Sequence, residues 1–548
     1  MTFSFANLNL KKAINSVDWK LLLFLLLFLD VKLGVKVAAI IIIYLLQFNF
    51  RFGFSLKNSR LPLFYLLIIV IAFVDLFITK SYGNPGYLFV FLTGIAFWIL
   101  CLLAIHQVKL SVENNGPEII HRTILVFFVI NAALSFYNIA HIIWETGAIN
   151  PYKYQGEYQK YFIGTGDYIK GLTFDTSTTN AVLNAFGVIY FLTKKNPVMV
   201  LICMAVLLLT GSNFTNLVLG SVLAILFLFK SSRDQKSLIV ICLMFLVVFM
   251  AKISPQNNRY VFQTIKNNIH PQKLQSPTIA VVKKTKSILT PEQVRRKIAQ
   301  DYLDSVYVAN HKNLDHPAIR AIHTIPKTDG GRIVIDTPNI NAIVYQSATD
   351  TTTEQRQLLT FIGSHKTNLP LSAKSGFTPG LPGKVIGLQQ TVKFLQHHPV
   401  KIIAGDGMGN FSSKLAFKAT TLGFAGGYPS KYAYISNDFL LNHLDLYLNF
   451  FSKRFGLHSL INSPYSVYDQ LLAEYGLLGL LAFAICYLGF FSKHFKKLTY
   501  GIPILVLMMA FFFIDYWFEQ LSVLVFFELL LLLNIKETTY LKPAHNGH

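Results

Sequence analysis

Residues 405–413 read GDGMGNFSS, and residues 462–479 read NSPYSVYDQLLAEYGLLG. The first stretch is a polar loop whose glycines permit tight turns and close backbone approach. The second stretch carries Asp469 and Glu474 to the start of an apolar run that continues to Phe491. A polar, glycine-bearing segment that meets a hydrophobic helix is where water-side chemistry can reach a lipid-borne substrate. We therefore expect the candidate active site at this junction.

The composition places the chain among polytopic membrane proteins. Of its 548 residues, 53% are hydrophobic and only 14% are charged, which leaves too little polar surface to cover a soluble domain. The formal net charge is +22, but Lys and Arg stand in short clusters between apolar runs and in one long loop. This pattern favours anionic lipid head groups and phosphates as partners and excludes nucleic acid. The four cysteines all lie in apolar runs, so the long loop has no disulfide framework.

Apolar runs predict the number of membrane spans. A helix needs roughly 17 to 25 mostly apolar residues to cross the hydrocarbon core. The runs predict about twelve spans, with no paired halves and no broken helices: 19–34, 37–50, 61–79, 86–108, 122–144, 180–193, 197–211, 214–229, 237–251, 467–491, 502–515 and 517–534. The expected fold is therefore an all-α polytopic membrane protein. A large, mixed and mainly helical loop domain separates its ninth and tenth spans.

The short loops predict the orientation. Cationic residues such as Lys194, Lys195, Lys236 and Lys493 collect on one side if the N-terminus is cytoplasmic. Both termini are then cytoplasmic, and the long loop lies outside the cytoplasm. We expect three regions: a bundle of nine helices over 1–252, the external loop domain over 253–466, and three more helices with a cytoplasmic tail over 467–548.

The long loop contains local signals of structure. The sequence TPEQ at 290–293 is a capping box with proline at the first helical position, and it predicts a helix over 291–309. Gly330 and Gly331 precede RIVI, which predicts a turn and a short strand. Pro382 and Pro399 flank a second predicted helix over 383–397.

Several polar residues are candidates for binding or catalysis. Lys414 and Lys418 are four apart, so both ammonium groups project from one helical face and could hold a pyrophosphate, although a solvated amphipathic turn is the more common reason for such spacing. His443 and His458 could each serve as a general base, although a lone histidine is more often structural. No carboxylate or cysteine stands at ligand spacing from the His397–His398 pair, so we predict no metal site.

A polar stripe lies along one face of the fifth predicted span. Asn131, Ser135 and Asn138 fall on one helical face, which should point into the bundle. The stripe either belongs to a site or joins helices by hydrogen bonds. The sequence TGSNFTN at 210–216 forms a second polar edge between two spans, and it is expected on the same external side.

Taken together, these motifs resemble the bacterial O-antigen ligase and O-antigen polymerase superfamily. The resemblance rests on GDGMGNF at 405–411, LLAEYGLLG at 471–479, and KGLTFD at 170–175 before Asn180, in this order and with a large external loop. Many members carry a His-Asn pair about nine residues before the glutamate that matches Glu474, where this chain has Tyr465 and Ser466. Arginines that are common in the family are also replaced, by Asn213 and Lys384.

The resemblance implies a metal-independent integral-membrane glycosyltransferase without a cofactor, in the bacterial inner membrane. Members take a glycan from an undecaprenyl-pyrophosphate carrier at the periplasmic face and pass it to lipid A-core or to another carrier-linked glycan. By this resemblance we expect Lys170, Lys384, Lys414 and Lys418 to bind the pyrophosphate. His443 or His458 is expected near the acceptor hydroxyl, with Tyr465 as the next candidate. Glu474 is expected to orient a basic residue, cap its helix or act as a base.

Two other classes share the hydrophobicity and the basic loops. A transporter or flippase of lipid-linked sugars would place its site near the membrane midplane, reachable from both sides. A scaffold or receptor would use the long loop for binding. An enzyme should instead gather Lys170, Lys384 and Lys414 around one external cavity.

Overall fold

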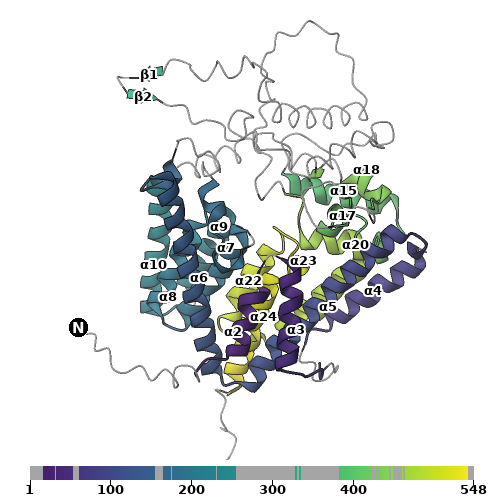
Figure 1. Cartoon of the computed structure of the whole chain (residues 1–548), viewed down its shortest axis with the longest axis horizontal. Coiled ribbons are helices and arrows are strands. Elements are labelled where there is room, and N and C mark those ends of the chain that lie inside the picture. The colour runs from purple at the N-terminus through teal and green to yellow at the C-terminus, as the bar shows by residue number, and fades with distance from the viewer. Residues whose placement is uncertain are drawn as a thin grey trace, which may run out of the picture.

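The structure is a computed structural model of the whole chain. It describes residues 16–30, 32–53, 61–79, 81–154, 164–174, 176–229, 231–254, the backbone of 327–329 and 332–334, and 382–420, 428–429, 432, 434–443, 446–447, 460 and 463–540. The described part is mainly helical (Figure 1).

Five helices begin the bundle: α2 (Trp19–Phe28), α3 (Leu33–Leu46), α4 (Phe64–Ile78), α5 (Pro85–Asn114) and α6 (Pro117–Thr146). Their ends follow the capping residues of the sequence. The Asp18 carboxylate accepts hydrogen bonds from the first N–H groups of α2, and Asn84 does the same for α5, which has proline at its first position. Gly147 in the left-handed conformation ends α6.

Four helices complete the N-terminal part: α7 (Ser177–Thr193), α8 (Pro197–Leu209), α9 (Asn213–Phe229) and α10 (Arg233–Val248). Ser232 and Gln235 form a capping box at the start of α10, and a π-helical turn, η6 (Phe249–Ile253), extends it. Short 3₁₀ turns lie in the connections: η1 (Ser81–Gly83), η2 (Pro151–Lys153), η4 (Gly164–Tyr168) and η5 (Gly171–Thr173).

The described part of the long loop is short. Strands β1 (Lys327–Asp329) and β2 (Arg332–Val334) pair antiparallel, which confirms the predicted short strand; the turn predicted at Gly330 and Gly331 lies outside the described residues. Helix α15 (Gly383–His397) has the predicted bounds and is followed by α16 (Lys401–Ala404), α17 (Lys414–Ala419) and α18 (Asn437–Asn442). The helix predicted over 291–309 lies outside the described residues.

The C-terminal part contains two interrupted helices. Helix α20 (Val467–Ala482) continues through the π-helical turn η10 (Phe483–Leu488) into α21 (Gly489–Ser492), and Gly476 within it is not helical. After η11 (Phe495–Lys497) and α22 (Gly501–Phe511), the residues expected as one span form α23 (Trp517–Gln520) and α24 (Ser522–Tyr540). Leu521 separates them with a positive φ of 69°. The prediction of unbroken helices was therefore wrong.

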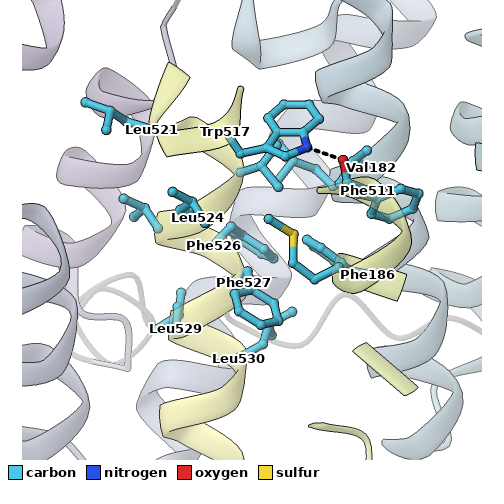
Figure 2. Packing of buried hydrophobic residues seen from close by; sticks show 14 of the residues in the cluster. Val182, Phe186, Phe511, Trp517, Leu521, Leu524, Phe526, Phe527, Leu529 and Leu530 are labelled. Atoms are coloured by element: carbon cyan, nitrogen blue, oxygen red, sulfur yellow. Dashed lines mark hydrogen bonds between the residues drawn. The ribbon is translucent and has the colours of Figure 1, made fainter. Parts of the chain in front are cut away.

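The interior is packed from helices far apart in the sequence. Figure 2 shows Val182 and Phe186 of α7 beside Phe511 of α22 and the apolar residues that follow Trp517. The Trp517 indole N–H donates to the carbonyl of Phe511 at 2.7 Å, so this large buried side chain leaves no unpaired donor. Helix α24 thus runs through the centre of the helical bundle (Figure 1).

Four of the described helical segments are long and apolar enough to cross a membrane: Pro85–Asn114, Pro117–Thr146, Arg233–Ile253 and Val467–Ser492. Shorter apolar helices, among them α2, α3, α4, α8, α9 and α22, lie beside them. These helices mark the protein as membrane-associated. Twelve spans and the assignment of loops to two sides stay a prediction.

Candidate functional site

The glycine loop 405–413 packs against a break in α20. At Gly476 the backbone takes φ 63° and ψ −160°, a region that is essentially restricted to glycine. The carbonyls of Ala473 and Glu474, just before the break, accept hydrogen bonds from the N–H groups of Asp406 and Gly407 at 2.9 and 3.1 Å. The loop 405–413 is therefore joined to α20 through its backbone.

The Glu474 carboxylate lies inside this loop. Its Oε2 accepts from the N–H of Gly409 at 2.8 Å, and its Oε1 accepts from the N–H groups of Phe411, Ser412 and Ser413 at 3.1, 3.1 and 2.9 Å. The residue is buried. Successive backbone N–H groups that enclose a carboxylate form a tight anion nest. Glu474 thus fixes the shape of the loop, and its contacts favour a positioning role over the role of a base.

The glycines of the loop are required by close packing. Gly405, Gly407 and Gly409 have φ of 87°, 92° and 78°. A side chain at Gly405 would come within 2.5 Å of the Tyr475 nitrogen, and one at Gly407 would come within 2.5 Å of Asp75 Oδ2. Gly405 and Gly476 face each other in the same way, because a side chain at Gly476 would lie 2.6 Å from the Gly405 nitrogen. The GDGMG motif and the EYG motif therefore form one interlocked unit.

Lys414 and Lys418 stand on α17, directly after this loop. Ser413 caps the helix through its side chain, which accepts from the N–H of Ala416 at 2.9 Å. The Lys414 ammonium lies 5.7 Å from the centre of the Tyr465 ring, within the range of a cation–π contact. Both lysines are partly exposed, and the charges of both act on the Glu519 carboxylate. The two cations are thus gathered at one place, as their spacing predicted.

Glu519 of α23 lies beside Lys414 and Lys418 of α17. Its carboxylate accepts from the backbone N–H of Leu415 and from the side-chain amide of Gln470, the latter at 2.7 Å. It therefore joins α17 to α20 and to α23, beside the two lysines. Sequence reasoning missed Glu519, which stands in an apolar stretch with no motif around it.

Lys384 reaches the same region but is enclosed. Its ammonium donates to the Ser463 hydroxyl at 3.0 Å and carbonyl at 3.2 Å, to the Tyr465 carbonyl, and more weakly to the Ile514 carbonyl at 3.4 Å. Burial lowers its pKa to about 7, against the opposing charges of Asp515 and Asp469. These acceptors occupy all the donors of an ammonium group. Lys384 therefore ties α15 to the segment that carries Tyr465, and binding of pyrophosphate would require it to give up these bonds.

Three tyrosine rings pack together beside these groups. The Tyr447 hydroxyl donates to the Ser412 carbonyl at 2.9 Å and lies 3.0 Å from the Tyr516 hydroxyl. The Tyr465 ring lies 5.0 Å from that of Tyr516 and 5.8 Å from that of Tyr447. Burial raises the pKa of Tyr465 well above its usual range, so its phenol stays protonated. Tyr465 can therefore donate a hydrogen bond beside Lys414, but it is a poor base at neutral pH.

His443 lies in the interior of the loop domain. Its Nδ1 lies 2.8 Å from Gln390 Oε1, which assigns the proton to this nitrogen, and its ring packs edge-on against Phe411 at 4.5 Å. Its Nε2 lies 3.4 Å from the Thr391 hydroxyl and 3.9 Å from Asp469 Oδ2. Burial lowers its pKa to about 3. These contacts favour a packing role, and a role as base stays a prediction. His458 lies outside the described residues.

Lys170 belongs to a different set of contacts. It directly precedes η5, whose Gly171 N–H donates to Asn138 Oδ1 at 3.1 Å. Asn131 donates to Asn180 Oδ1 at 2.9 Å and accepts from the Leu172 N–H. The polar stripe of α6 therefore faces the bundle interior and joins α6 to α7 and to η5. The contacts of the described residues do not bring Lys170 to Lys384 or Lys414.

A second charged cluster adjoins the loop and was not predicted. Lys401 of α16 forms ion pairs with Asp406 and with Asp438, the latter at 2.8 Å. Burial and the charge of Asp438 raise the pKa of Asp406, while Lys401 lowers it; the net pKa is well above the usual range. Asn410 completes the cluster by accepting from the Tyr434 hydroxyl at 3.0 Å. The pairs tie α16 and α18 to the glycine loop. Among the described residues, no three His, Cys, Asp or Glu side chains are grouped as metal ligands.

Comparison of the chain with models of known protein families, with curated proteins and with solved structures finds no match. The family resemblance of the motifs therefore enters the functional argument as a proposal.

Proposed function

We propose that the protein is an integral-membrane glycosyltransferase of the O-antigen ligase or polymerase type. In this proposal it transfers or polymerises undecaprenyl-pyrophosphate-linked oligosaccharide at the periplasmic face of the bacterial inner membrane, in the synthesis of cell-surface polysaccharide or lipopolysaccharide. The observation that carries the proposal is the pair Lys414 and Lys418 on one short helix, set beside Tyr465 and Glu519.

The chemistry of such a transfer calls for localised positive charge. The acceptor hydroxyl oxygen forms a bond to the anomeric carbon and its proton passes to solvent water, while the bond from that carbon to the pyrophosphate oxygen breaks. Negative charge then grows on the departing pyrophosphate, and cations already in position at that point stabilise the transition state more than the ground state. Lysine supplies this charge without the bidentate geometry of arginine. Lys414 and Lys418 are partly open to solvent and can meet such a group.

The remaining residues of the site hold Lys414 and Lys418 in position. Glu474 holds the loop that leads into α17, and Glu519 receives the N–H of Leu415 within α17. Lys384 holds the backbone of Tyr465. We assign these three residues positioning roles. In this proposal the protonated Tyr465 phenol donates to a phosphate oxygen beside Lys414.

The test combines deletion with charge reversal. We expect deletion of the gene to change the glycans of the cell envelope and the wild-type gene to restore them. Lys414→Ala should lower transfer by about 100-fold, the usual loss for one group that stabilises transition-state charge. Lys414→Glu should lower it further, because it repels the pyrophosphate. Lys393→Glu is the matched control, since this lysine is exposed on α15 and stands outside the cluster. Near-normal activity of Lys414→Glu at equal protein level would refute the assignment.

The alternative is a transporter or flippase of lipid-linked sugars. The observation that favours it is the pair of interrupted helices, at Gly476 and at Leu521, because transporters often place their sites at broken spans. Purified protein in liposomes with a carrier-linked glycan separates the two functions. A transferase lengthens or moves the glycan, which mass spectrometry detects, whereas a flippase changes only the leaflet in which the carrier lies.

A further inference from the structure

The exposed face of α15 is divided along its length into an apolar and a polar half. Val385, Leu388 and Val392 are exposed at i, i+3 and i+7, the spacing of a continuous stripe along a helix. Lys393 and His397 are exposed on the other half, and Leu388 and Lys393 are about 140° apart around the helix. The opposite face of α15 is buried through Ile386, Phe394 and Leu395. Such a division is typical of a helix that lies in the plane of a membrane surface.

The apolar half continues onto α16 and α20. Val400, which directly precedes α16, is 80% exposed and Ile403 of α16 is 59% exposed, although both are large aliphatic residues. The Ile403 carbonyl packs directly against Gly476 of α20. The residues that follow Gly476 are again exposed and apolar: Leu477, Leu478 and Leu481. They belong to the segment Val467–Ser492, which is long and apolar enough to cross a membrane.

The free energy of burying apolar side chains indicates whether this surface faces water or lipid. Burying one aliphatic side chain of this size stabilises by about 1.5 to 3 kcal/mol when the burial is complete. Five such side chains are exposed on α15, α16 and the residue before α16, and Ile403 among them adjoins α20 at Gly476: Val385, Leu388, Val392, Val400 and Ile403. We call these five residues the apolar stripe. A stripe of this size in water would be unusual for a soluble surface.

We propose that α15 and α16 lie within the leaflet at the end of the bundle where α20 begins. The apolar stripe contacts the acyl chains, and Lys393 and His397 face the head groups and water. Helix α15 lies against the first turns of α20, where the Thr391 hydroxyl donates to Asp469 Oδ1 at 2.7 Å (Figure 1). The residues 383–404, expected as part of the external loop domain, are then an interfacial membrane element. This proposal does not depend on the proposed glycosyltransferase activity.

Site-directed spin labelling of the full-length protein in liposomes tests the proposal. The four native cysteines are replaced, and single cysteines are introduced as Leu388→Cys, Val392→Cys and Ile403→Cys, with Lys393→Cys as the matched control on the same helix. Collision with oxygen reports lipid, and collision with a water-soluble nickel chelate reports water. We expect the ratio of oxygen to nickel collisions to be several-fold higher at the three stripe positions than at Lys393→Cys.

Two results would overturn the proposal. Equal, nickel-dominated ratios at all four positions would place α15 in water. Low collision with both reagents at the stripe would mean that another protein segment covers it. If the cysteine-free protein does not fold, Leu388→Trp and Lys393→Trp in the native background give the same comparison through quenching by lipids brominated on their acyl chains. Extra quenching is expected for Leu388→Trp alone, and its absence would also refute the proposal.

Discussion

The carboxylate of Glu474 joins two segments that are more than sixty residues apart along the chain, through four backbone N–H groups. We expect Glu474→Gln to destabilise the protein by more than about 3 kcal/mol, because the amide NH₂ turns a donor toward buried donors and leaves N–H groups unpaired. Thermal unfolding in detergent measures the loss. Glu118→Gln is the control, since Glu118 is exposed at the start of α6. Equal stability of the two variants would contradict the nest.

His443 carries a prediction on pH. Its pKa is lowered to about 3 by burial, below the ordinary value of 6.5, so the folded protein binds fewer protons here than the unfolded chain. The stability that the neutral ring provides is complete above pH 6.5 and is lost as the pH falls toward 3. The slope from this group is at most about 1.4 kcal/mol per pH unit.

Chemical denaturation at several pH values measures this slope. We expect His443→Gln to flatten it between pH 3 and 6.5 relative to wild type, because glutamine does not titrate. Asp469, which lies beside His443, is present in both proteins and is therefore matched in the comparison. An unchanged slope would show that other groups dominate the acid sensitivity.

At the scale of elements, the break in α20 depends on glycine. We expect Gly476→Ala to separate the loop 405–413 from α20, because alanine is strained at this φ and ψ and its methyl group would meet the backbone of Ile403 and Gly405. Gly489→Ala is the matched control further along the same span, where the nearest atom would be 3.4 Å away. Loss of thermal stability and new protease cleavage near the loop should follow in the first variant and be absent in the second.

Helices with local signals could be predicted from the sequence, and interrupted ones could not. Pro382 and Pro399 mark the ends of α15, and each expected apolar run overlaps an observed helix. Gly476 and Leu521 stand within apolar runs, where nothing in the neighbouring residues separates a break from a continuous span. Partners distant in sequence accompany such a break, as where the N–H groups of Asp406 and Gly407 donate to the carbonyls of Ala473 and Glu474.

The candidate site was predicted in part for the same reason. The spacing of Lys414 and Lys418 is a local property, so the sequence placed both on one helical face. The Lys384 ammonium is enclosed because it donates to the carbonyls of Ser463 and Tyr465, and no local pattern in the sequence brings these residues near it. Glu519 lies on α23, which is separated from α24 at Leu521, and no local pattern marks that separation.

At the scale of the whole molecule, contacts among the residues at and beyond the helix ends define two ends of the bundle. At one end, Asn150 donates to the Ile253 carbonyl at 3.0 Å, and the Tyr152 hydroxyl donates to the Leu209 carbonyl at 2.5 Å. At the other end, Lys194 pairs with Glu537 at 2.5 Å, and Asn115 donates to Asp18 at 2.8 Å. The second end carries the lysines of the short loops, which predicts that it faces the cytoplasm.

This orientation predicts the labelling of single cysteines in cells. Lys153→Cys and Lys393→Cys replace exposed lysines at the first end, whereas Lys195→Cys and Lys493→Cys replace exposed lysines assigned to the second. A maleimide that does not cross membranes should label the first pair in intact spheroplasts and the second pair only after permeabilisation. The physical reason is the cost of translocating clustered cations during insertion, which retains them on the cytoplasmic side. Labelling of both pairs in intact spheroplasts would contradict the orientation. Labelling of the second pair alone would invert it and would move Lys414, Lys418 and the glycine loop away from the side on which a periplasmic transferase must act.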